Sequence, residues 1–164
     1  MENPKDYGFN SQLIHYSGHH DHYGSATVPI YQTSTFAFES AQDGADCFAG
    51  VKPGYMYTRI GNPTVKALER QVALLEHAFD SVAVASGMAA VSTVYLGLLN
   101  AGDHVVSSSA VYGASRVLME QHMSRFGVES TYVNTADLDA VKAAMRPNTK
   151  MLYVETPANP TMEI

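Results

Sequence analysis

Four short polar segments each follow an apolar run, and they carry the side chains best suited to chemistry. In the first, Ser86 and Gly87 come between the Val- and Ala-rich residues 81–85 and an apolar pattern at helical spacing. A turn that opens a helix aims unpaired backbone N–H groups and the positive end of the helix dipole at one spot, which favours an anion such as phosphate. Gly87 lets the backbone approach closely, and the Ser86 hydroxyl can donate a hydrogen bond. The alternative is an ordinary strand-to-helix turn with Ser86 as its N-cap.

The other three segments supply an aromatic ring, a carboxylate and a carboxamide. They are Ser108–Tyr112, Asn134–Thr135 and Glu155–Asn159. If the four segments meet, they suit a phosphorylated, planar aromatic cofactor. The phosphate binds at the turn described above, Tyr112 stacks on the ring, and Asn159 hydrogen-bonds a ring substituent.

Tyr57 and Arg59 form a second candidate anion site. They stand two residues apart in a segment with an extended pattern, so both side chains point to the same side. Together they could clamp a phosphate or an oxyanion. The alternative is a surface arginine stacked on a tyrosine. Asn62 followed by Pro63 marks the start of a helix, because Asn is a favoured cap and Pro a favoured first residue.

The elements that must position these residues alternate between strands and helices. The order βαβαβαβ predicts a parallel sheet with helices packed on its faces. Ligands of such sheets bind beyond the carboxyl ends of the strands, so we expect the four polar segments on one rim. The strands are expected at 81–85, 104–109, 129–134 and 150–155.

Apolar stripes predict the buried faces of the helices, and capping residues predict their ends. Ser40 and Thr135 are expected N-caps, and Gly127 is expected to end a helix. The stripes are Val65, Leu68, Val72, Leu75 and Phe79 in the first helix after Asn62; Ala90, Val91, Val94 and Leu98 in the second; Val117, Leu118, His122, Met123 and Phe126 in the third; and Leu138, Val141 and Met145 in the fourth.

Composition excludes several classes of protein. No run of about 18 uncharged apolar residues is present, so no membrane-spanning helix is expected. The polar residues 1–6 lack the apolar region of a secretory signal. Cys47 is the single cysteine, which excludes an internal disulfide framework and fits a reducing cytoplasm. The net charge of −6 and the scattered basic residues argue against a nucleic-acid surface.

Residues 1–62 show little apolar periodicity, and a segment of this length without regular structure is expected to be an arm that packs on another subunit. It carries a histidine cluster, His15, His19, His20 and His22. Neighbouring ligands on a Gly-flanked loop tend to splay apart, so a solvated loop is favoured over a metal site, and no metal is expected.

Four motifs resemble the pyridoxal 5'-phosphate (PLP) enzymes of Cys/Met metabolism, the trans-sulfuration enzymes. The similarity covers nearly the whole chain from Tyr7 onward, and within the family it is strongest to methionine γ-lyases and homoserine sulfhydrylases. The motifs are Tyr57-Thr-Arg59-Ile-Gly-Asn-Pro-Thr, Ala85-Ser-Gly-Met-Ala-Ala90, Val111-Tyr-Gly113 and Val154-Glu-Thr-Pro-Ala-Asn-Pro160.

The resemblance implies an α/β fold: an N-terminal arm, then the first half of the mostly parallel-sheet large domain of a PLP-transferase, aspartate aminotransferase-like (fold type I). Residues 1–62 are the implied arm on a neighbouring subunit, and residues 63–164 an incomplete PLP-binding α/β domain. The implied assembly is a cytoplasmic homotetramer, a dimer of dimers with shared active sites. The implied partners are a sulfur-containing amino acid or an activated homoserine, with neither nucleic acid nor membrane.

The resemblance also implies a role for each candidate site residue. PLP acts as the electron sink for the substrate carbanion. Ser86, Gly87 and Met88 hold its phosphate, while Tyr57 and Arg59 bind the phosphate of the neighbouring subunit's PLP. Tyr112 stacks on the pyridine ring and is the general acid toward the leaving thiol, and Asn159 hydrogen-bonds the ring hydroxyl oxygen with support from Glu155.

The implied reaction is the α,γ-elimination of a C–S lyase, which gives a thiol, ammonia and a 2-oxo acid. Ala114 stands where methionine γ-lyases usually carry a cysteine, which leaves an O-acetyl- or O-succinylhomoserine sulfhydrylase or a cystathionine γ-synthase or γ-lyase open. The family's Schiff-base lysine and pyridine-binding aspartate have no counterpart in these residues, so we expect the chain alone to be inactive. A catalytically inactive assembly module and a non-PLP phosphate-binding domain are the alternatives of other classes.

Overall fold

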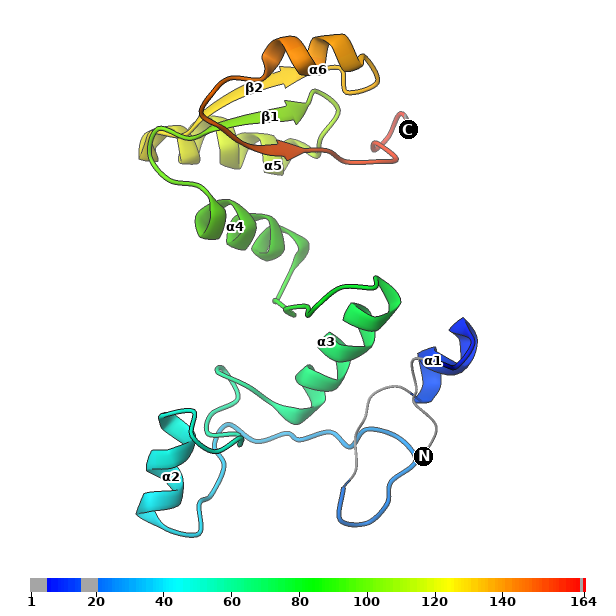
Figure 1. Ribbon diagram of the computed structural model, residues 1–164, viewed down its shortest axis with the longest axis vertical. Coiled ribbons are helices and arrows are strands. Elements are labelled where there is room, and N and C mark those ends of the chain that lie inside the picture. The colour runs from blue at the N-terminus through cyan, green and yellow to red at the C-terminus, as the bar shows by residue number, and fades with distance from the viewer. Residues whose placement is uncertain (1–5, 16–20, 163) are drawn as a thin grey trace. The chain divides into compact units, whose positions relative to one another are not determined.

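The computed structural model describes residues 6–15, 21–162 and 164 of the chain. It divides into two compact units, Met1–Ala83 (unit 1) and Val84–Ile164 (unit 2), which are described separately below. No helix in the described ranges is long and apolar enough to cross a membrane. The elements in chain order are α1 (Phe9–His15), α2 (Ala41–Phe48), α3 (Pro63–Leu75), α4 (Gly87–Leu98), β1 (His104–Ser108), α5 (Gly113–Val117), the π-helical turn η2 (Leu118–His122), the 3-10 turn η3 (Met123–Phe126), β2 (Glu129–Val133), α6 (Leu138–Ala144) and β3 (Thr149–Tyr153) (Figure 1).

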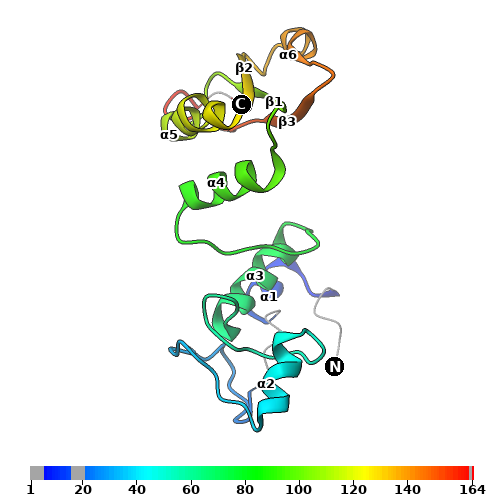
Figure 2. The ribbon, with the colours of Figure 1, turned by 90° about the vertical axis from the view of Figure 1, so that its left-hand side faces the viewer.

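Unit 2 is built on a parallel sheet of three strands in the order β2-β1-β3, as the alternating pattern predicts. Ser107 of β1 lies opposite Tyr132 of β2 and Tyr153 of β3, so all three strands end at the same edge. Every residue of the central strand β1 is buried. Figures 1 and 2 show α5 and α6 on opposite faces of this sheet.

The core of unit 2 lies between β1 and the helices on one face of the sheet. Tyr95 of α4 is 2 % exposed, and its ring meets that of Tyr153 edge-on, with the centroids 5.4 Å apart. The contact fixes α4 against β3, whose strand ends at the candidate site. The buried members of this cluster are Tyr95, Leu99, Val105, Met119, Met123 and Val128.

The expected strand at 81–85 is wrong, because these residues form no strand in the structure. Val82 and Val84 are 76 % and 40 % exposed. A strand is held by hydrogen bonds to a neighbouring strand, and none of the strands in the described ranges pairs with this segment. The local Val and Ala pattern indicates a buried strand but cannot supply its partner.

Helix starts follow the expected caps at two of three positions, Ser40 and Asn62, and Ser86 caps α4 as in the alternative to an anion-binding turn. Ser40, Asn62 and Ser86 each accept a backbone N–H of the first helical turn through their side-chain oxygen. The expected cap at Thr135 is wrong: Asp137 caps α6 and accepts N–H groups at 3.0 and 3.1 Å. The cap is therefore displaced by two residues, because the aspartate is the stronger acceptor at the helix start.

The predicted buried faces of α3 and α4 are largely wrong. α4 buries Tyr95, and of its expected stripe Val91 packs against the core, whereas Val94 and Leu98 are 42 % and 56 % exposed. α4 is apolar on nearly all sides, so its sequence has no single stripe that identifies the inner face. α3 buries the small residues Ala67 and Ala73.

The helical run after Tyr112 is continuous but changes its winding from α5 to η2 to η3. Its buried residues Ser115, Met119 and Met123 recur every four positions, so the inner face differs from the expected one, of which Met123 is buried and Leu118 is partly buried against the core. Gly127 ends the run with φ of +80°, as expected from its lack of a side chain.

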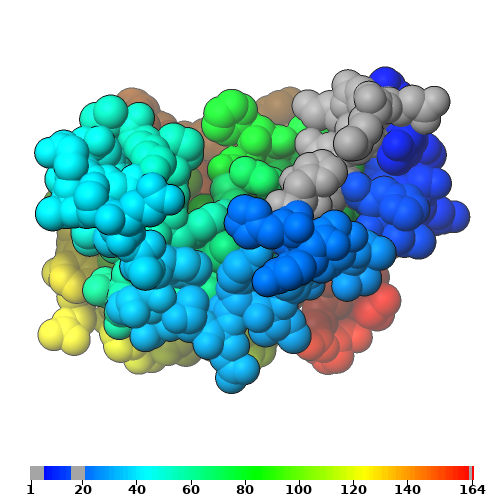
Figure 3. Space-filling view, turned by 90° about the horizontal axis from the view of Figure 1, so that it is seen from below, coloured from blue at the N-terminus to red at the C-terminus, as the bar shows by residue number. Residues whose placement is uncertain are grey.

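In unit 1, an extended segment before α2 lies beside the residues that lead into α3. The Asn62 side chain donates to the carbonyl of Tyr31 at 2.9 Å, and Thr35 forms an antiparallel bridge with Tyr57. Figure 3 shows the surface of the segment that includes α2 in cyan. The structure thus groups α3 with the residues before it, and the packing of residues 1–62 on a neighbouring subunit stays a prediction.

Candidate functional site

The carboxyl ends of the three strands of unit 2 surround a cavity of about 200 Å³. Residues from the end of each strand line it, so three of the four polar segments meet at one rim as expected. The polar side chains of the lining are Ser108, Ser109, Asn134, Thr135, Glu155 and Thr156.

Tyr112 and Glu155 are joined at this rim. The backbone N–H of Tyr112 donates to Oε2 of Glu155 at 2.8 Å. Tyr112 is the residue before α5, and its side chain is 52 % exposed. The ring is therefore accessible to a ligand, while the backbone that carries it is fixed to the end of β3.

The start of α4 has the features of an anion-binding turn. The Ser86 hydroxyl accepts the N–H of Ala89, and the Ser86 carbonyl accepts that of Ala90 at 3.0 Å. This leaves the N–H groups of Gly87 and Met88 without a partner inside the helix. Gly87 is exposed, and an added Cβ there would meet no heavy atom of the described residues within 4 Å, so a ligand can approach the backbone at this residue.

Ser115 connects this turn to the segment that carries Tyr112. Its side chain is 2 % exposed, and its Oγ lies 3.8 Å from Sδ of Met88. The start of α4 and the start of α5 are thus in contact within unit 2. The sequence reasoning missed Ser115, although its spacing with Met119 and Met123 is the helical signal of a buried face.

Tyr57 and Arg59 belong to unit 1, and there they take the stacked arrangement that was the alternative to a clamp. The Arg59 guanidinium carbon lies 5.3 Å from the centroid of the Tyr57 ring. Both residues line a groove of about 660 Å³ together with residues 30–34. Both side chains are exposed, so the pair can still contact an anion.

The structure supports no cofactor or metal contact by Asn159 or by the described residues of the histidine cluster. Asn159 is exposed and does not line the rim cavity, so its contact with a cofactor stays a prediction. His19 and His20 lie outside the described residues. Among those that the structure describes, no three His, Cys, Asp or Glu side chains gather as a metal site would require. Cys47 is buried in unit 1, in keeping with a small apolar role.

The opposite end of the sheet holds a buried histidine. His104 has an exposed fraction of 0 %, and its ring nitrogens lie 2.8 Å from the Thr149 hydroxyl and 2.9 Å from the Thr131 hydroxyl. Arg146 also contacts both threonines and pairs with Glu129. Burial, and then the positive charge of Arg146, lower the pKa of His104. The sequence reasoning treated this residue only as the start of a strand.

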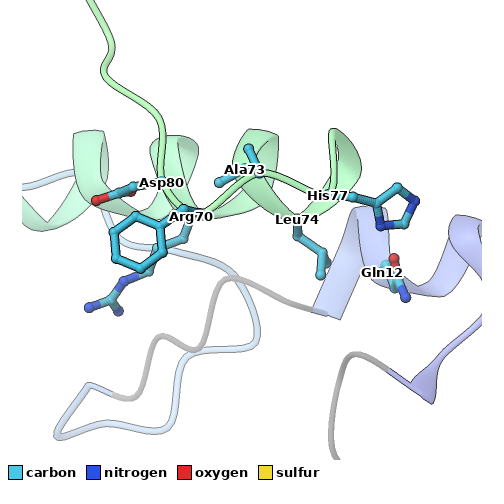
Figure 4. Close-up of a pocket in the computed structure, with 8 residues that line it drawn as sticks. Gln12, Arg70, Ala73, Leu74, His77 and Asp80 are labelled. Carbon is cyan, nitrogen blue, oxygen red and sulfur yellow. The ribbon is translucent and has the colours of Figure 1, made fainter.

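A separate cavity of about 330 Å³ lies between α1 and the end of α3 in unit 1 (Figure 4). Gln12 from α1 and Arg70, His77 and Asp80 from α3 and the residues after it line it. Asp80 pairs with Lys66 at 3.0 Å, which together with a backbone N–H bond lowers the pKa of the carboxyl group.

Comparison with known proteins places these observations in a family. The model of the Cys/Met metabolism PLP-dependent enzymes matches residues 10–164. L-Methionine γ-lyase of Fusobacterium nucleatum subsp. polymorphum is 48 % identical over 160 residues, which are 98 % of this chain and 40 % of that protein.

Two solved structures have the same fold. The crystal structure of metB from Corynebacterium glutamicum has a TM-score of 0.88 at 41 % identity and covers 99 % of this chain and 41 % of its own. A putative O-acetylhomoserine (thiol)-lyase of Campylobacter jejuni, which carries a pyridoxyl-lysine phosphate, has a TM-score of 0.86 at 30 % identity. The match covers 100 % of this chain and 40 % of that one. The chain thus spans about 40 % of the length of these relatives. With the parallel sheet, the rim and the family match in agreement, the chain belongs to the Cys/Met metabolism PLP-dependent enzymes.

Proposed function

We propose that the protein carrying this chain is a PLP-dependent C–S lyase that cleaves methionine or a related thioether amino acid by α,γ-elimination. The products are a thiol, ammonia and a 2-oxo acid. The observation that carries the proposal is the position of Tyr112, whose segment is tied to Glu155 at the rim and, through Ser115, to Met88 at the start of α4. The predicted acid and the predicted phosphate site are therefore neighbours.

The residues at the start of α4 fit the phosphate of PLP. Gly87 and Met88 offer two N–H groups with no partner in the helix, and Gly87 is exposed. The Ser86 hydroxyl accepts one hydrogen bond as the cap and still has a hydrogen to donate. PLP, when bound, supplies an electron sink for the negative charge that develops at the substrate Cα.

Tyr112 has two tasks in the proposed reaction. Its ring covers the planar cofactor, and its hydroxyl donates a proton to the sulfur of the departing thiol. Asn159 hydrogen-bonds the ring hydroxyl oxygen of PLP in this proposal. Tyr57 and Arg59 act on the phosphate of a neighbouring subunit, in a cytoplasmic dimer of dimers. Their exposure and their position beside an open groove support a contact with another chain.

A second candidate reaction is the replacement of an activated homoserine side group by a sulfur nucleophile. Ala114 favours it, because methionine γ-lyases usually carry a cysteine at this place. The similarity to a putative O-acetylhomoserine (thiol)-lyase supports it as well. In either case we expect residues 1–164 alone to be inactive, since none of the lysines in the described part of the chain lines the rim cavity.

The test is a product assay on the purified, PLP-loaded protein. One reaction contains L-methionine, and thiol and 2-oxo acid are measured. A parallel reaction contains O-acetylhomoserine and sulfide, and homocysteine is measured. Equal amounts of thiol and 2-oxo acid from methionine support the lyase, while homocysteine without 2-oxo acid supports the sulfhydrylase. Failure to form any of these products contradicts both.

A further inference from the structure

The contact between Glu155 and Tyr112 joins two chain segments that are distant in sequence. The carboxylate oxygen lies 2.8 Å from the Tyr112 nitrogen, across a separation of 43 residues. We propose that Glu155 is a positioning residue, which holds the Tyr112 backbone so that the ring and hydroxyl reach the substrate. The inference rests on the proposed function, in which Tyr112 is the acid.

Tyr112 has little else to orient it. Its side chain is 52 % exposed and makes no hydrogen bond to any residue that the structure describes. The ring of an exposed residue takes its direction from the backbone to which it is attached. The Tyr112 carbonyl accepts the N–H of Arg116 at 3.1 Å, but the backbone dihedrals of Tyr112, φ −51° and ψ 133°, are extended rather than helical, so the residue lies outside the regular turns of α5. The hydrogen bond to Glu155 holds the other side of the residue, its N–H group.

A carboxylate suits this place for two reasons. It accepts the N–H in a charge-assisted hydrogen bond, which is stronger than a neutral one. It also stands next to the start of α5, where the helix dipole favours a negative charge. The segment is held at its other end by Ser115, which is buried against Met88. Residues 112–115 are therefore fixed between the end of β3 and the start of α4.

Glu120, which lies in the helical run after Tyr112, provides a matched control for Glu155. Glu120 pairs with Arg116 one turn away at 2.8 Å, and both side chains are at least 40 % exposed. It has the same charge as Glu155 and lies on the same stretch of chain as Tyr112, but it makes no contact with Tyr112. An effect of charge alone would appear in both glutamate variants, whereas an effect of positioning appears only at Glu155.

The test compares the purified PLP-loaded parent with Glu155→Ala, Glu155→Met, Glu155→Gln and Glu120→Ala. Methionine keeps the length of the side chain without a strong acceptor, which guards against a folding defect in the alanine variant. Amide hydrogen exchange is measured at Tyr112, and kcat, KM and the PLP content by absorbance are measured with a thioether amino acid. Thermal melting confirms that each variant is folded.

We expect exchange at Tyr112 to be about tenfold faster or more in Glu155→Ala and Glu155→Met, as the loss of a charge-assisted hydrogen bond implies. Their kcat should fall by about 10- to 100-fold, since small misplacements of a reacting group have effects of this order. KM and PLP content should stay near those of the parent. Glu155→Gln should stay within about threefold of the parent, because its amide oxygen can accept the same N–H.

Unchanged exchange at Tyr112 in the folded Glu155→Met variant overturns the proposal, and so does a kcat of Glu155→Gln as low as that of Glu155→Ala. A parent-like kcat in Glu155→Met overturns it too. Failure of the proposed function is a separate result, because the exchange measurement needs no substrate. If the parent cleaves no thioether amino acid while exchange in Glu155→Met is faster, the lyase assignment fails and the anchoring of Tyr112 is supported.

Discussion

The buried imidazole of His104 makes the stability of unit 2 depend on pH. His104 lies between β2 and β3 and bonds to the hydroxyl groups of Thr131 and Thr149, which are 2.9 and 2.8 Å away. Charged groups face it from two sides: Glu129 on β2, and Arg146 in the connection to β3. Burial is the larger cause of its lowered pKa, and the Arg146 charge adds to it. The ring therefore binds a proton less readily in the folded protein than in the unfolded chain.

The sign of the pH effect follows from proton binding. The usual pKa of histidine is 6.5, and the folded value is lower. Between these two values the unfolded chain binds more protons than the folded protein, so the free energy of unfolding rises with pH. The contribution of His104 is complete above about pH 6.5 and is lost as the pH falls toward the lowered pKa. The slope is at most about 1.4 kcal/mol per pH unit for one proton.

The perturbation is His104→Gln, which cannot titrate and can keep at most one of the two hydrogen bonds. At pH 8 it should lower the free energy of unfolding by about 0.5–1.5 kcal/mol, the net value of one hydrogen bond. Urea unfolding of the purified protein is measured from pH 8 to pH 5 for parent and variant. We expect the advantage of the parent to shrink as the pH falls below about 6.5. His122→Gln is the control, because His122 is exposed.

A constant or growing advantage of the parent at low pH would refute this reasoning. It would mean that the imidazole accepts a proton in the folded state, with both N–H groups donating to the two threonines.

Three further predictions concern other parts of the chain. Arg59→Ala should weaken retention of PLP, because a charged hydrogen bond is worth roughly 1.5–3 kcal/mol; an unchanged dissociation rate of PLP, followed by absorbance after dilution, would contradict the role of Arg59. Asn62→Ala should lower the free energy of unfolding by about 1 kcal/mol through loss of the α3 cap, and an unchanged urea midpoint would count against it. Gly127→Ala should destabilise the protein by about 1 kcal/mol or more, because φ is +80° and the added Cβ would lie 3.3 Å from that of Ala101; a melting temperature at or above that of the parent would show the strain is absent.

The sequence predicts best what is decided within a few residues. The caps at Ser40 and Asn62 and the helix end at Gly127 depend on side chains and dihedrals of one turn, and the structure has them as expected. The three strands of unit 2 start and end within two residues of the expected positions, because each is bounded by turn-forming residues.

The errors arise where a distant part of the chain decides the outcome. The segment 81–85 has the composition of a strand, but a strand exists only beside a partner. The inner face of α4 is set by the contact of Tyr95 with Tyr153. These two residues are far apart in the sequence, with β1 and β2 between them. No local pattern in a helix that is apolar on nearly all sides identifies that face.

In the candidate site, too, some features follow from the sequence and others depend on contacts between distant residues. Parallel topology alone brings the ends of β1, β2 and β3 to one rim, and the cavity there is lined by three of the four segments expected from the sequence, without Ser86 and Gly87. The pairing of Glu155 with the Tyr112 backbone and the contact of Ser115 with Met88 link residues 43 and 27 positions apart. Such pairings follow from the packing of elements, which spacing along the chain does not specify.

The most direct test of the account is the effect of Tyr112→Phe on thiol release from a thioether amino acid by the PLP-loaded protein. The two side chains differ only in the hydroxyl, so stacking on the cofactor is retained. The account predicts that the variant keeps its PLP, judged by absorbance, while kcat for thiol release falls by about 10²–10⁴-fold through loss of the general acid. Thiol release at the parent rate with full PLP content would contradict the account, because Tyr112 would then be a stacking surface and not the acid.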